Sequence, residues 1–367
     1  MKTAVITRHA ISNYGSLLQA LATQQVLTDL GHECKIIEYI RADENYHNFE
    51  KTLLARKPGW NNNPIKRLVY LALRQGPCVS AGKRFELARS QYLSTTKLYT
   101  SLQELENDKP QADIYITGSD QVWGPVANGS YDSAYCLSFT SPEDKRISYA
   151  ASFGHTDMTT ELERYFTEQL SRYDKLAVRE DSAVEMLRKM GLSACQVIDP
   201  TLLLDRDYWG RYLRPIKHKN YILIYQLHSD KRLGAYAKRV AKELGCRLIR
   251  VSASFHQISR EGKLIYAPDP GSFLSYIRNA RCMITDSFHG TAFAINFNTP
   301  FVEVLPNTNT GTRNMSILRL TGLEDRVLRD IDDTSLAGAD IDFTHANEVI
   351  AQKRRESLDI LREMLEA

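Results

Sequence analysis

A histidine at a strand-to-helix junction is the residue of this 367-residue chain best placed for chemistry. His289 lies in the stretch RCMITDSFHGTAFAINFNTPF, residues 281–301, where apolar residues 282–284 predict a buried strand and 291–297 a helix. Ligands of open α/β sheets bind beyond the carboxyl ends of strands, and the following helix N-terminus attracts anions. We therefore expect an anionic substrate on the N–H groups of Gly290 and Thr291, beside the imidazole. A purely structural histidine is the alternative.

A carboxylate follows another predicted strand, residues 113–117, in the sequence Gly118-Ser119-Asp120. This is not the GxSxG turn of a serine hydrolase, and no Ser-His-Asp order with matching context occurs elsewhere. We interpret Asp120 as a base or as a ligand of an acceptor hydroxyl. A helix N-cap or a turn residue is the alternative.

Near the start, a strand at 2–7, a loop at 8–15, a helix at 16–30 and a strand at 33–40 predict a βαβ unit. The loop places Asn13, Gly15 and Ser16 where a helix N-terminus could contact a phosphate or a sugar. It lacks GxGxxG and therefore gives no dinucleotide signal. A tight turn at Gly15 and a cap at Ser16 are the alternatives.

Five blocks in order resemble the polysaccharide pyruvyl transferase family. They are NYGSLLQALATQQVL from residue 13, ITGSDQVW at 116–123, ISYAASFG at 147–154, VREDSA with DPTLLL between 178 and 204, and the His289 stretch. The resemblance implies transfer of the pyruvyl unit of phosphoenolpyruvate to two hydroxyls of a sugar or oligosaccharide, giving a cyclic ketal and phosphate. The acceptor would be a lipid- or nucleotide-linked precursor of a cell-surface polysaccharide.

The resemblance also implies roles for individual residues. His289 would be the proton donor, and Arg179 matches the arginine of the family's strand-then-Arg-Glu motif, as a bidentate clamp on an anion. A surface pair with Glu180 or Asp181 is the alternative for Arg179. Family members carry an arginine two residues before the histidine, where this chain has Ser287 among its expected substrate-binding residues.

Arg313, in the polar stretch NTNTGTRN at 307–314, is the expected replacement for that missing cation. It would fold from a loop over the substrate site, since the loop follows the predicted strand 301–305. An arginine merely solvated in its loop is the alternative.

Composition excludes several classes of protein. The hydrophobic fraction is 43%, the charged fraction 25% and the formal net charge +3, which argues against a nucleic-acid partner. No segment reads as a signal peptide or approaches the ~20 apolar residues of a membrane span, so we expect a cytoplasmic protein. Six scattered cysteines indicate free thiols. Without a metal-ligand motif, we expect no metal and no cofactor, with phosphoenolpyruvate as co-substrate.

Alternating strands and helices predict an α/β fold with two Rossmann-like domains, at 1–205 and 206–345, that face a cleft. A charged helix at 346–367 would cross back over the first domain. This is the glycosyltransferase-B architecture, which the resemblance also implies. The first domain would carry a helical insertion at about 41–110.

The insertion is basic, with nine Lys or Arg residues against one acid, Glu86, between residues 51 and 89. A solvated helical face is the simpler interpretation. The alternative is a surface that docks on anionic lipid or on a diphosphate-bearing acceptor, which would place the protein peripherally at the inner face of a membrane.

Fold alone cannot separate pyruvyl transfer from two other functions. A glycosyltransferase that uses a nucleotide sugar would have the same architecture. A non-catalytic carbohydrate-binding relative would keep the fold and lose the acid.

Overall fold

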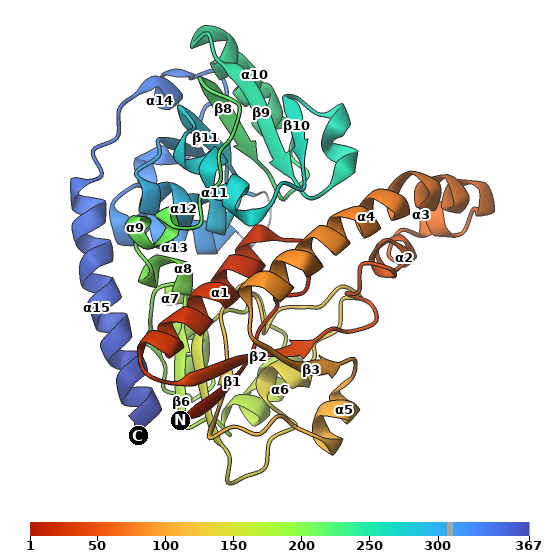
Figure 1. Cartoon of the computed structure of the whole chain (residues 1–367), viewed down its shortest axis with the longest axis vertical. Coiled ribbons are helices and arrows are strands. Elements are labelled where there is room, and N and C mark those ends of the chain that lie inside the picture. Colours follow the sequence, from red (N-terminus) through yellow and green to blue (C-terminus); the bar gives the residue numbers. More distant parts are fainter. Residues whose placement is uncertain (307–310, 367) are drawn as a thin grey trace. The chain divides into compact units, whose positions relative to one another are not determined.

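The computed structural model describes residues 1–306 and 311–366 (Figure 1). The chain forms two compact units, the first of Met1–Leu203 with Arg355–Ala367 and the second of Leu204–Arg354. The division therefore falls two residues before the expected boundary. The last helix, α15 (Thr344–Glu366), is shared between the units rather than forming a separate region.

The first unit is built on a seven-stranded parallel sheet with the order β3-β2-β1-β4-β5-β6-β7. Its strands are β1 (Lys2–Ile6), β2 (Glu33–Tyr39), β3 (Thr95–Tyr99), β4 (Ile114–Thr117), β5 (Lys145–Ala151), β6 (Lys175–Val178) and β7 (Cys195–Gln196). Its helices are α1 (Tyr14–Asp29), α2 (Phe49–Ala55), α3 (Pro58–Asn61), α4 (Pro64–Tyr92), α5 (Leu102–Asn107), η1 (Ser133–Cys136), α6 (Thr160–Leu170), α7 (Asp181–Lys189) and α8 (Pro200–Leu203). The order reverses beside β1 and β4, as in a doubly wound sheet.

The expected helical insertion at 41–110 is wrong in one respect, because it contains a strand of the sheet. β3 pairs with β2 at the sheet edge. Its sequence TTKLY places Lys97 and Leu98 in solvent, so it lacks the apolar run that marks a buried parallel strand. The rest of the segment is dominated by one 29-residue helix, α4.

Helix α4 has two differently used halves (Figure 1). Asn63 caps its start by accepting a hydrogen bond from the N–H of Lys66 at 3.0 Å. Pro77 lies in the middle of the helix. In the second half, the buried Phe85 packs its ring 4.9 Å from that of Tyr14 on α1, which anchors this half to the unit.

The second unit is built on a five-stranded parallel sheet with the order β10-β9-β8-β11-β12. Its strands are β8 (Tyr221–Tyr225), β9 (Arg247–Ser252), β10 (Lys263–Tyr266), β11 (Cys282–Thr285) and β12 (Phe301–Glu303). Its helices are α9 (Arg206–Gly210), α10 (Lys231–Glu243), η2 (Phe255–Ser259), α11 (Pro270–Arg278), α12 (Phe288–Phe297), α13 (Gly311–Thr321), η3 (Glu324–Arg326), α14 (Ser335–Gly338) and the first part of α15. The strand-helix alternation predicted from the sequence is confirmed here.

Helix α12 lies at the centre of this unit, since all ten of its residues are buried. Phe293 packs edge-on against Trp209 of α9, with ring centroids 5.2 Å apart. A helix that is apolar all round is stable only inside a core. The residue that begins this helix, Phe288, comes three positions earlier than predicted, so His289 belongs to the helix and not to a preceding turn.

Two smaller expectations concern thiols and membranes. All six cysteines are free thiols, as predicted. Among the helices that the structure describes, none is both long and apolar enough to cross a bilayer.

Candidate active site

In the second unit, the candidate site is the end of β11, where a chain of hydrogen bonds fixes the start of α12. The Thr285 hydroxyl donates to the carbonyl of Tyr225 at 2.7 Å and accepts from the N–H of Ser287 at 3.1 Å. Ser287 is the N-cap of α12, because its Oγ accepts from the N–H of Gly290 at 3.2 Å. These bonds hold His289, which is 5% exposed, at the carboxyl edge of the sheet.

The N–H groups of Gly290 and Thr291, which were expected to hold an anion, both have partners within the protein. The Gly290 N–H donates to Ser287 Oγ, and the Thr291 N–H donates to the Ser287 carbonyl at 2.9 Å. Gly290 instead allows close packing, since an added Cβ would lie 2.7 Å from Thr285 Oγ1 and 3.0 Å from Tyr225 Cδ1. Glycine is therefore needed for α12 to approach β8 and β11.

A buried carboxyl group beneath α12 was not anticipated from the sequence. Glu303, at the end of β12, is 0% exposed; its Oε1 accepts from Asn314 Nδ2 at 2.6 Å and its Oε2 contacts the Thr291 hydroxyl. The same hydroxyl reaches the Ser287 carbonyl at 3.1 Å. One hydroxyl proton cannot serve two acceptors, so the contacts are all satisfied only if Glu303 carries a proton and donates it to Thr291.

Electrostatics agree with a protonated Glu303. Burial raises its pKa to about 8, with a further rise from the charge of Asp286, and the hydrogen bonds that Thr291 and Asn314 would donate to the ionised carboxylate only partly oppose this rise in pKa. Glu303 is therefore largely neutral at pH 7. The signal in the sequence was an acidic residue inside the apolar strand FVEV, which is costly unless the acid is neutral or paired.

We predict that Glu303→Gln flattens the pH dependence of stability. The pKa of Glu303 in the folded state lies above its unfolded-state value of 4.5. The stability that this proton contributes is therefore fully present below about pH 4.5 and is lost as pH rises through about 8. For this shift the loss amounts to roughly 3 to 5 kcal/mol. Urea unfolding at several pH values measures it. Glutamine can donate to Thr291 and accept from Asn314, so the variant should be more stable than wild type at pH 8.

The exposed Glu143 provides the matched control, since Glu143→Gln removes an acid that contacts solvent. Its unfolding free energy should follow the wild-type pH profile. A Glu303→Gln profile parallel to wild type would show that the carboxyl is ionised in the folded protein.

A second histidine lies at the same edge of the sheet, after β8, which pairs with β11. The Asp286 carboxylate accepts from the N–H of Leu227 at 2.7 Å and from the N–H of His228 at 2.9 Å. The His228 ring nitrogen Nδ1 lies 3.3 Å from the same carboxylate. Asp286 thus fixes the loop after β8 against the His289 motif. His228 was not predicted from the sequence, although it follows a strand just as His289 does.

Arg313 is not in a loop, contrary to the sequence prediction. It lies in the first turn of α13 and is 7% exposed. Residues 307–310 of the predicted loop lie outside the described residues. The next residue, Asn314, bonds to Glu303, whose other oxygen contacts Thr291 of α12. The start of α13 is therefore tied, through one carboxyl group, to the helix that carries His289.

A buried arginine on β9 was also missed. Arg250 is 0% exposed and donates to the Glu261 carbonyl at 2.9 Å, to Gln226 Oε1 at 2.9 Å and to Gln257 Oε1 at 3.1 Å. Burial, with the nearby charge of Arg260, lowers its pKa to about 10. Through Gln226 it supports the start of the loop that carries His228.

In the first unit, the structure joins two residues that were singled out separately. The Ser16 hydroxyl donates to Asp120 Oδ2 at 2.5 Å, and Asp120 Oδ1 accepts from the N–H of Gln121 at 2.8 Å. Asp120 has a φ of 72°, in the left-handed region that is uncommon for residues other than glycine. Such backbone strain persists where the surroundings fix it, often at functional sites. The N-cap alternative for Asp120 is wrong, and the turn alternative describes its bond to Gln121.

The two structural alternatives for the first loop are also wrong in detail. Asn13, and not Ser16, is the N-cap of α1, because its Oδ1 accepts from the N–H of Gly15 at 2.8 Å and of Ser16 at 3.5 Å. Gly15 lies in the first helical turn instead of a tight turn. These two N–H groups thus have a partner within the protein.

Arg179 follows β6 and is 4% exposed, so it does not form a surface pair. Its Nε donates to Glu180 Oε1 and its Nη1 to Asp199 Oδ2, both at 2.8 Å. Burial alone would lower the pKa of Arg179, but the charges of Glu180 and Asp199 raise it overall. This edge of the guanidinium holds protein carboxylates, so it is not a ready bidentate clamp for a substrate.

Carboxylates outnumber arginines around Asp120. Arg8 pairs with Glu44 at 2.6 Å. The negative charge of Asp120 acts to raise the pKa of both Arg8 and Arg179. The arginines are Arg8 and Arg179, and the carboxylates are Glu44, Asp120, Glu180 and Asp199. A site with this balance suits hydroxyl groups better than a doubly anionic ligand.

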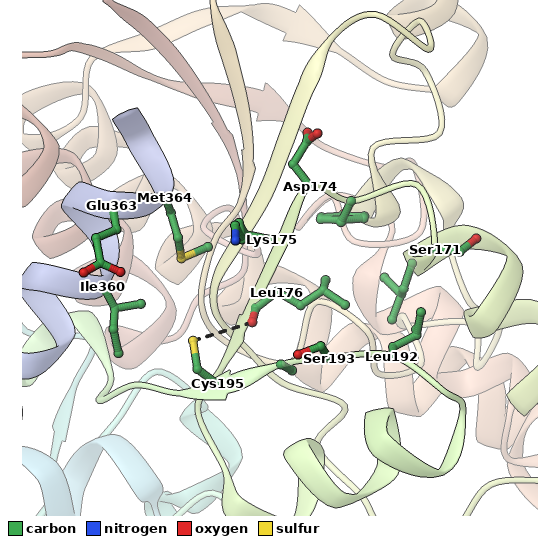
Figure 2. Close-up of a pocket in the computed structure, with 13 residues that line it drawn as sticks. Ser171, Asp174, Lys175, Leu176, Leu192, Ser193, Cys195, Ile360, Glu363 and Met364 are labelled. Atoms are coloured by element: carbon green, nitrogen blue, oxygen red, sulfur yellow. Dashed lines mark hydrogen bonds between the residues drawn. The ribbon is translucent and has the colours of Figure 1, made fainter. Parts of the chain in front are cut away.

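A cavity of about 660 Å³ lies elsewhere in the first unit (Figure 2). It is lined by Lys175 at the start of β6, by Cys195 of β7, and by Ile360 and Met364 of α15. Cys195 Sγ donates to the Leu176 carbonyl at 3.7 Å. Because Lys175 begins the strand that Arg179 follows, this cavity is at the opposite edge of the sheet from the site residues.

Comparison with solved structures defines the fold class. Arabidopsis thaliana UGT89C1 complexed with UDP-L-rhamnose has a TM-score of 0.53 at 10% identity, over 99% of this chain and 98% of that chain. The UDP-GlcNAc 2-epimerase of Methanocaldococcus jannaschii, in complex with UDP-GlcNAc and UDP, has a TM-score of 0.53 at 14% identity, over 100% of both chains. At these identities the likeness shows the fold alone, a glycosyltransferase-B-like α/β fold, as predicted.

Comparison with protein families defines the family. The polysaccharide pyruvyl transferase family matches residues 13–309, which is most of the chain, so the protein belongs to that family. This confirms the resemblance noted in the sequence. A search of curated proteins finds no significant match.

Proposed function

We propose that the protein transfers the pyruvyl group of phosphoenolpyruvate to two hydroxyls of one sugar, forming a cyclic ketal and releasing phosphate. Family membership and the fixed position of His289 at the carboxyl end of β11 carry this proposal. The acceptor is a sugar or oligosaccharide of a polysaccharide precursor that is linked to a lipid or to a nucleotide.

The reaction needs an acid and two additions of oxygen. His289 donates a proton to the methylene carbon of phosphoenolpyruvate, which leaves oxocarbenium character on the neighbouring carbon. One sugar hydroxyl adds there and loses its proton. Phosphate then leaves with the bonding electrons, the second hydroxyl adds and loses its proton, and the ketal closes. One proton has been consumed at carbon and two are released, one of which neutralises a charge on phosphate.

The neutral state of Glu303 supports this assignment. The donor brings a carboxylate and a phosphate, and an ionised Glu303 beneath the first turn of α12 would add a repelling negative charge. A proton on Glu303 removes that repulsion while the carboxyl group still holds Thr291 and Asn314.

We propose Arg313 as a cation for the donor carboxylate, in place of the arginine that Ser287 replaces. For the first unit, we propose Asp120 as the base for acceptor hydroxyls, with Ser16 orienting its carboxylate at 2.5 Å. The surplus of carboxylates around Asp120 favours contacts with hydroxyls. Arg179 donates a hydrogen bond to Asp199 in this cluster, so it would contribute positive charge to the site more than a direct bidentate contact with the substrate.

The decisive experiment incubates the purified protein with phosphoenolpyruvate and a panel of sugar acceptors, and follows phosphate release and the mass of the product. A pyruvyl transferase releases phosphate only with an acceptor and adds a pyruvyl group to it. A glycosyltransferase would ignore phosphoenolpyruvate and consume a nucleotide sugar. A binding relative would do neither.

We predict that His289→Ala lowers turnover by about 10² to 10⁴, the usual contribution of a general acid. Steady-state phosphate release measures the loss, and thermal unfolding checks that the variant folds. His345→Ala, at an exposed position on α15, is the matched control and should keep wild-type turnover. Near-normal turnover in His289→Ala would remove this residue from the mechanism.

We predict that Arg313→Lys raises the Michaelis constant for phosphoenolpyruvate about ten- to a hundredfold, since lysine keeps the charge but loses the planar fork. The constant for the acceptor should change much less. Arg319→Lys, at an exposed position on the same helix, controls for general effects on α13. Unchanged donor kinetics in both Arg313→Lys and Arg313→Ala would exclude Arg313 as a donor ligand.

We also propose that the transfer needs no metal and no cofactor, because an imidazole acid and guanidinium groups can meet its demands for a proton and for positive charge. Turnover should therefore survive treatment with a chelator. A loss of turnover restored by a divalent cation would contradict this.

A further inference from the structure

The first half of α4 carries an apolar stripe that faces solvent. Ile65, Leu68, Val69 and Leu73 are 75%, 70%, 45% and 70% exposed. Their spacing of three and four residues places them on one face of the helix. A surface helix normally turns such a face toward its own core. Here it points away, and the stripe spans about 12 Å along the helix axis.

The opposite face explains why the helix is oriented this way. Tyr70 is 7% exposed and donates to Glu50 Oε2 on α2 at 2.9 Å, while Arg74 Nη1 donates to the Tyr70 hydroxyl at 3.0 Å. Lys57 and Arg74 also lie over the Tyr70 ring, at 5.3 and 4.8 Å from its centroid. The helix is therefore fixed through its other face, and the stripe stays outward.

The segment that carries the stripe is basic and contains an exposed tryptophan. Residues 51–84 contain eight Lys or Arg residues and no acid. Among them, Lys51, Lys57, Lys66 and Arg67 are exposed, and Trp60 of α3 is 46% exposed. Exposed apolar residues in a basic segment that also carries a tryptophan are typical of helices that lie in the interface of a membrane.

Charge separates a membrane from a second copy of this chain as the occupant. Two copies meeting through the stripe would bring two equally basic segments together, which costs free energy. An anionic bilayer offers both hydrocarbon for the apolar stripe and negative charge for the basic segment. Figure 1 shows α3 and the first half of α4 extending away from the β-sheet of their own unit.

We propose that α3 and the first half of α4 dock the protein on an anionic bilayer. The role of this docking rests on the proposed function, because a lipid-linked acceptor is presented at such a surface. The docking itself requires no phosphoenolpyruvate and can be measured separately.

The test is co-sedimentation with vesicles of phosphatidylcholine containing phosphatidylglycerol, compared with vesicles of phosphatidylcholine alone. Wild type should bind the anionic vesicles and lose binding as salt is added. Lys66→Gln/Arg67→Gln should weaken binding roughly thirtyfold at low salt, at about one kcal/mol for each charge. Leu68→Ser/Leu73→Ser should weaken it at least about tenfold at any salt concentration, because the lost burial is apolar.

Two matched controls come from elsewhere in the chain. Leu98→Ser removes a leucine that is 55% exposed on β3, and Lys217→Gln/Lys219→Gln removes two exposed charges of the second unit. Both should bind vesicles like wild type. Equal vesicle binding by wild type, Lys66→Gln/Arg67→Gln and Leu68→Ser/Leu73→Ser would overturn the proposal. A wild-type dimer in lipid-free solution that Leu68→Ser/Leu73→Ser converts to monomer would also overturn it.

Activity distinguishes a failure of docking from a failure of the proposed function. With a soluble acceptor, Lys66→Gln/Arg67→Gln and Leu68→Ser/Leu73→Ser should both turn over like wild type, since neither change touches the candidate active site. Vesicle binding without any use of phosphoenolpyruvate would leave docking supported and the pyruvyl transfer refuted. Turnover without vesicle binding would leave the pyruvyl transfer supported and the docking refuted.

Discussion

A proton on one buried carboxyl group organises the part of the molecule on which the proposed chemistry depends. Glu303 connects the end of β12 to α12 through Thr291 and to α13 through Asn314. If it were ionised, a buried charge would have two neutral partners among the described residues, which is costly in a region of low dielectric. The neutral form instead satisfies each contact and leaves the Thr291 hydroxyl to support the Ser287 carbonyl. The position of His289 therefore follows from a protonation state as well as from packing.

The charge around His289 differs from the charge around Asp120, and this difference is the basis of the separate roles that we propose for the two residues. Near His289 a carboxyl group is neutralised by burial, whereas Asp120 and three other carboxylates are held beside two arginines. The first environment tolerates an anionic donor and the second favours hydroxyl groups. Burial and ion pairing thus give the two units different chemistry on similar parallel sheets.

The sequence predicted the fold well where strands are buried on both faces. Residues 282–284 were expected as a strand and the structure has Cys282–Thr285, because a parallel strand reads as an apolar run. β3 was missed because an edge strand lacks that run. The start of α12 was misplaced because TDSFHG reads as a turn, while the Oγ of Ser287 in fact caps a helix that already contains His289.

The candidate site was predictable at the level of residues and less so at the level of contacts. His289, Asp120 and Ser16 follow strands or begin helices, which a pattern can reveal. The bond between Ser16 and Asp120 joins residues 104 positions apart, and Asp199 meets Ser119 across 80 positions. Such pairs depend on strand order, and the proton on Glu303 depends on burial, neither of which a local pattern contains.

Pro77 gives α4 a mechanical property that follows from its covalent structure. Proline has no N–H, so the carbonyl of Leu73 lacks its usual partner four residues later, and the ring crowds that carbonyl. Resistance to bending is therefore lowest between the stripe and the half held by Phe85. The backbone of α4 therefore does not by itself hold the first half rigid, and the bond from Tyr70 to Glu50 on α2 supplies that support from the side.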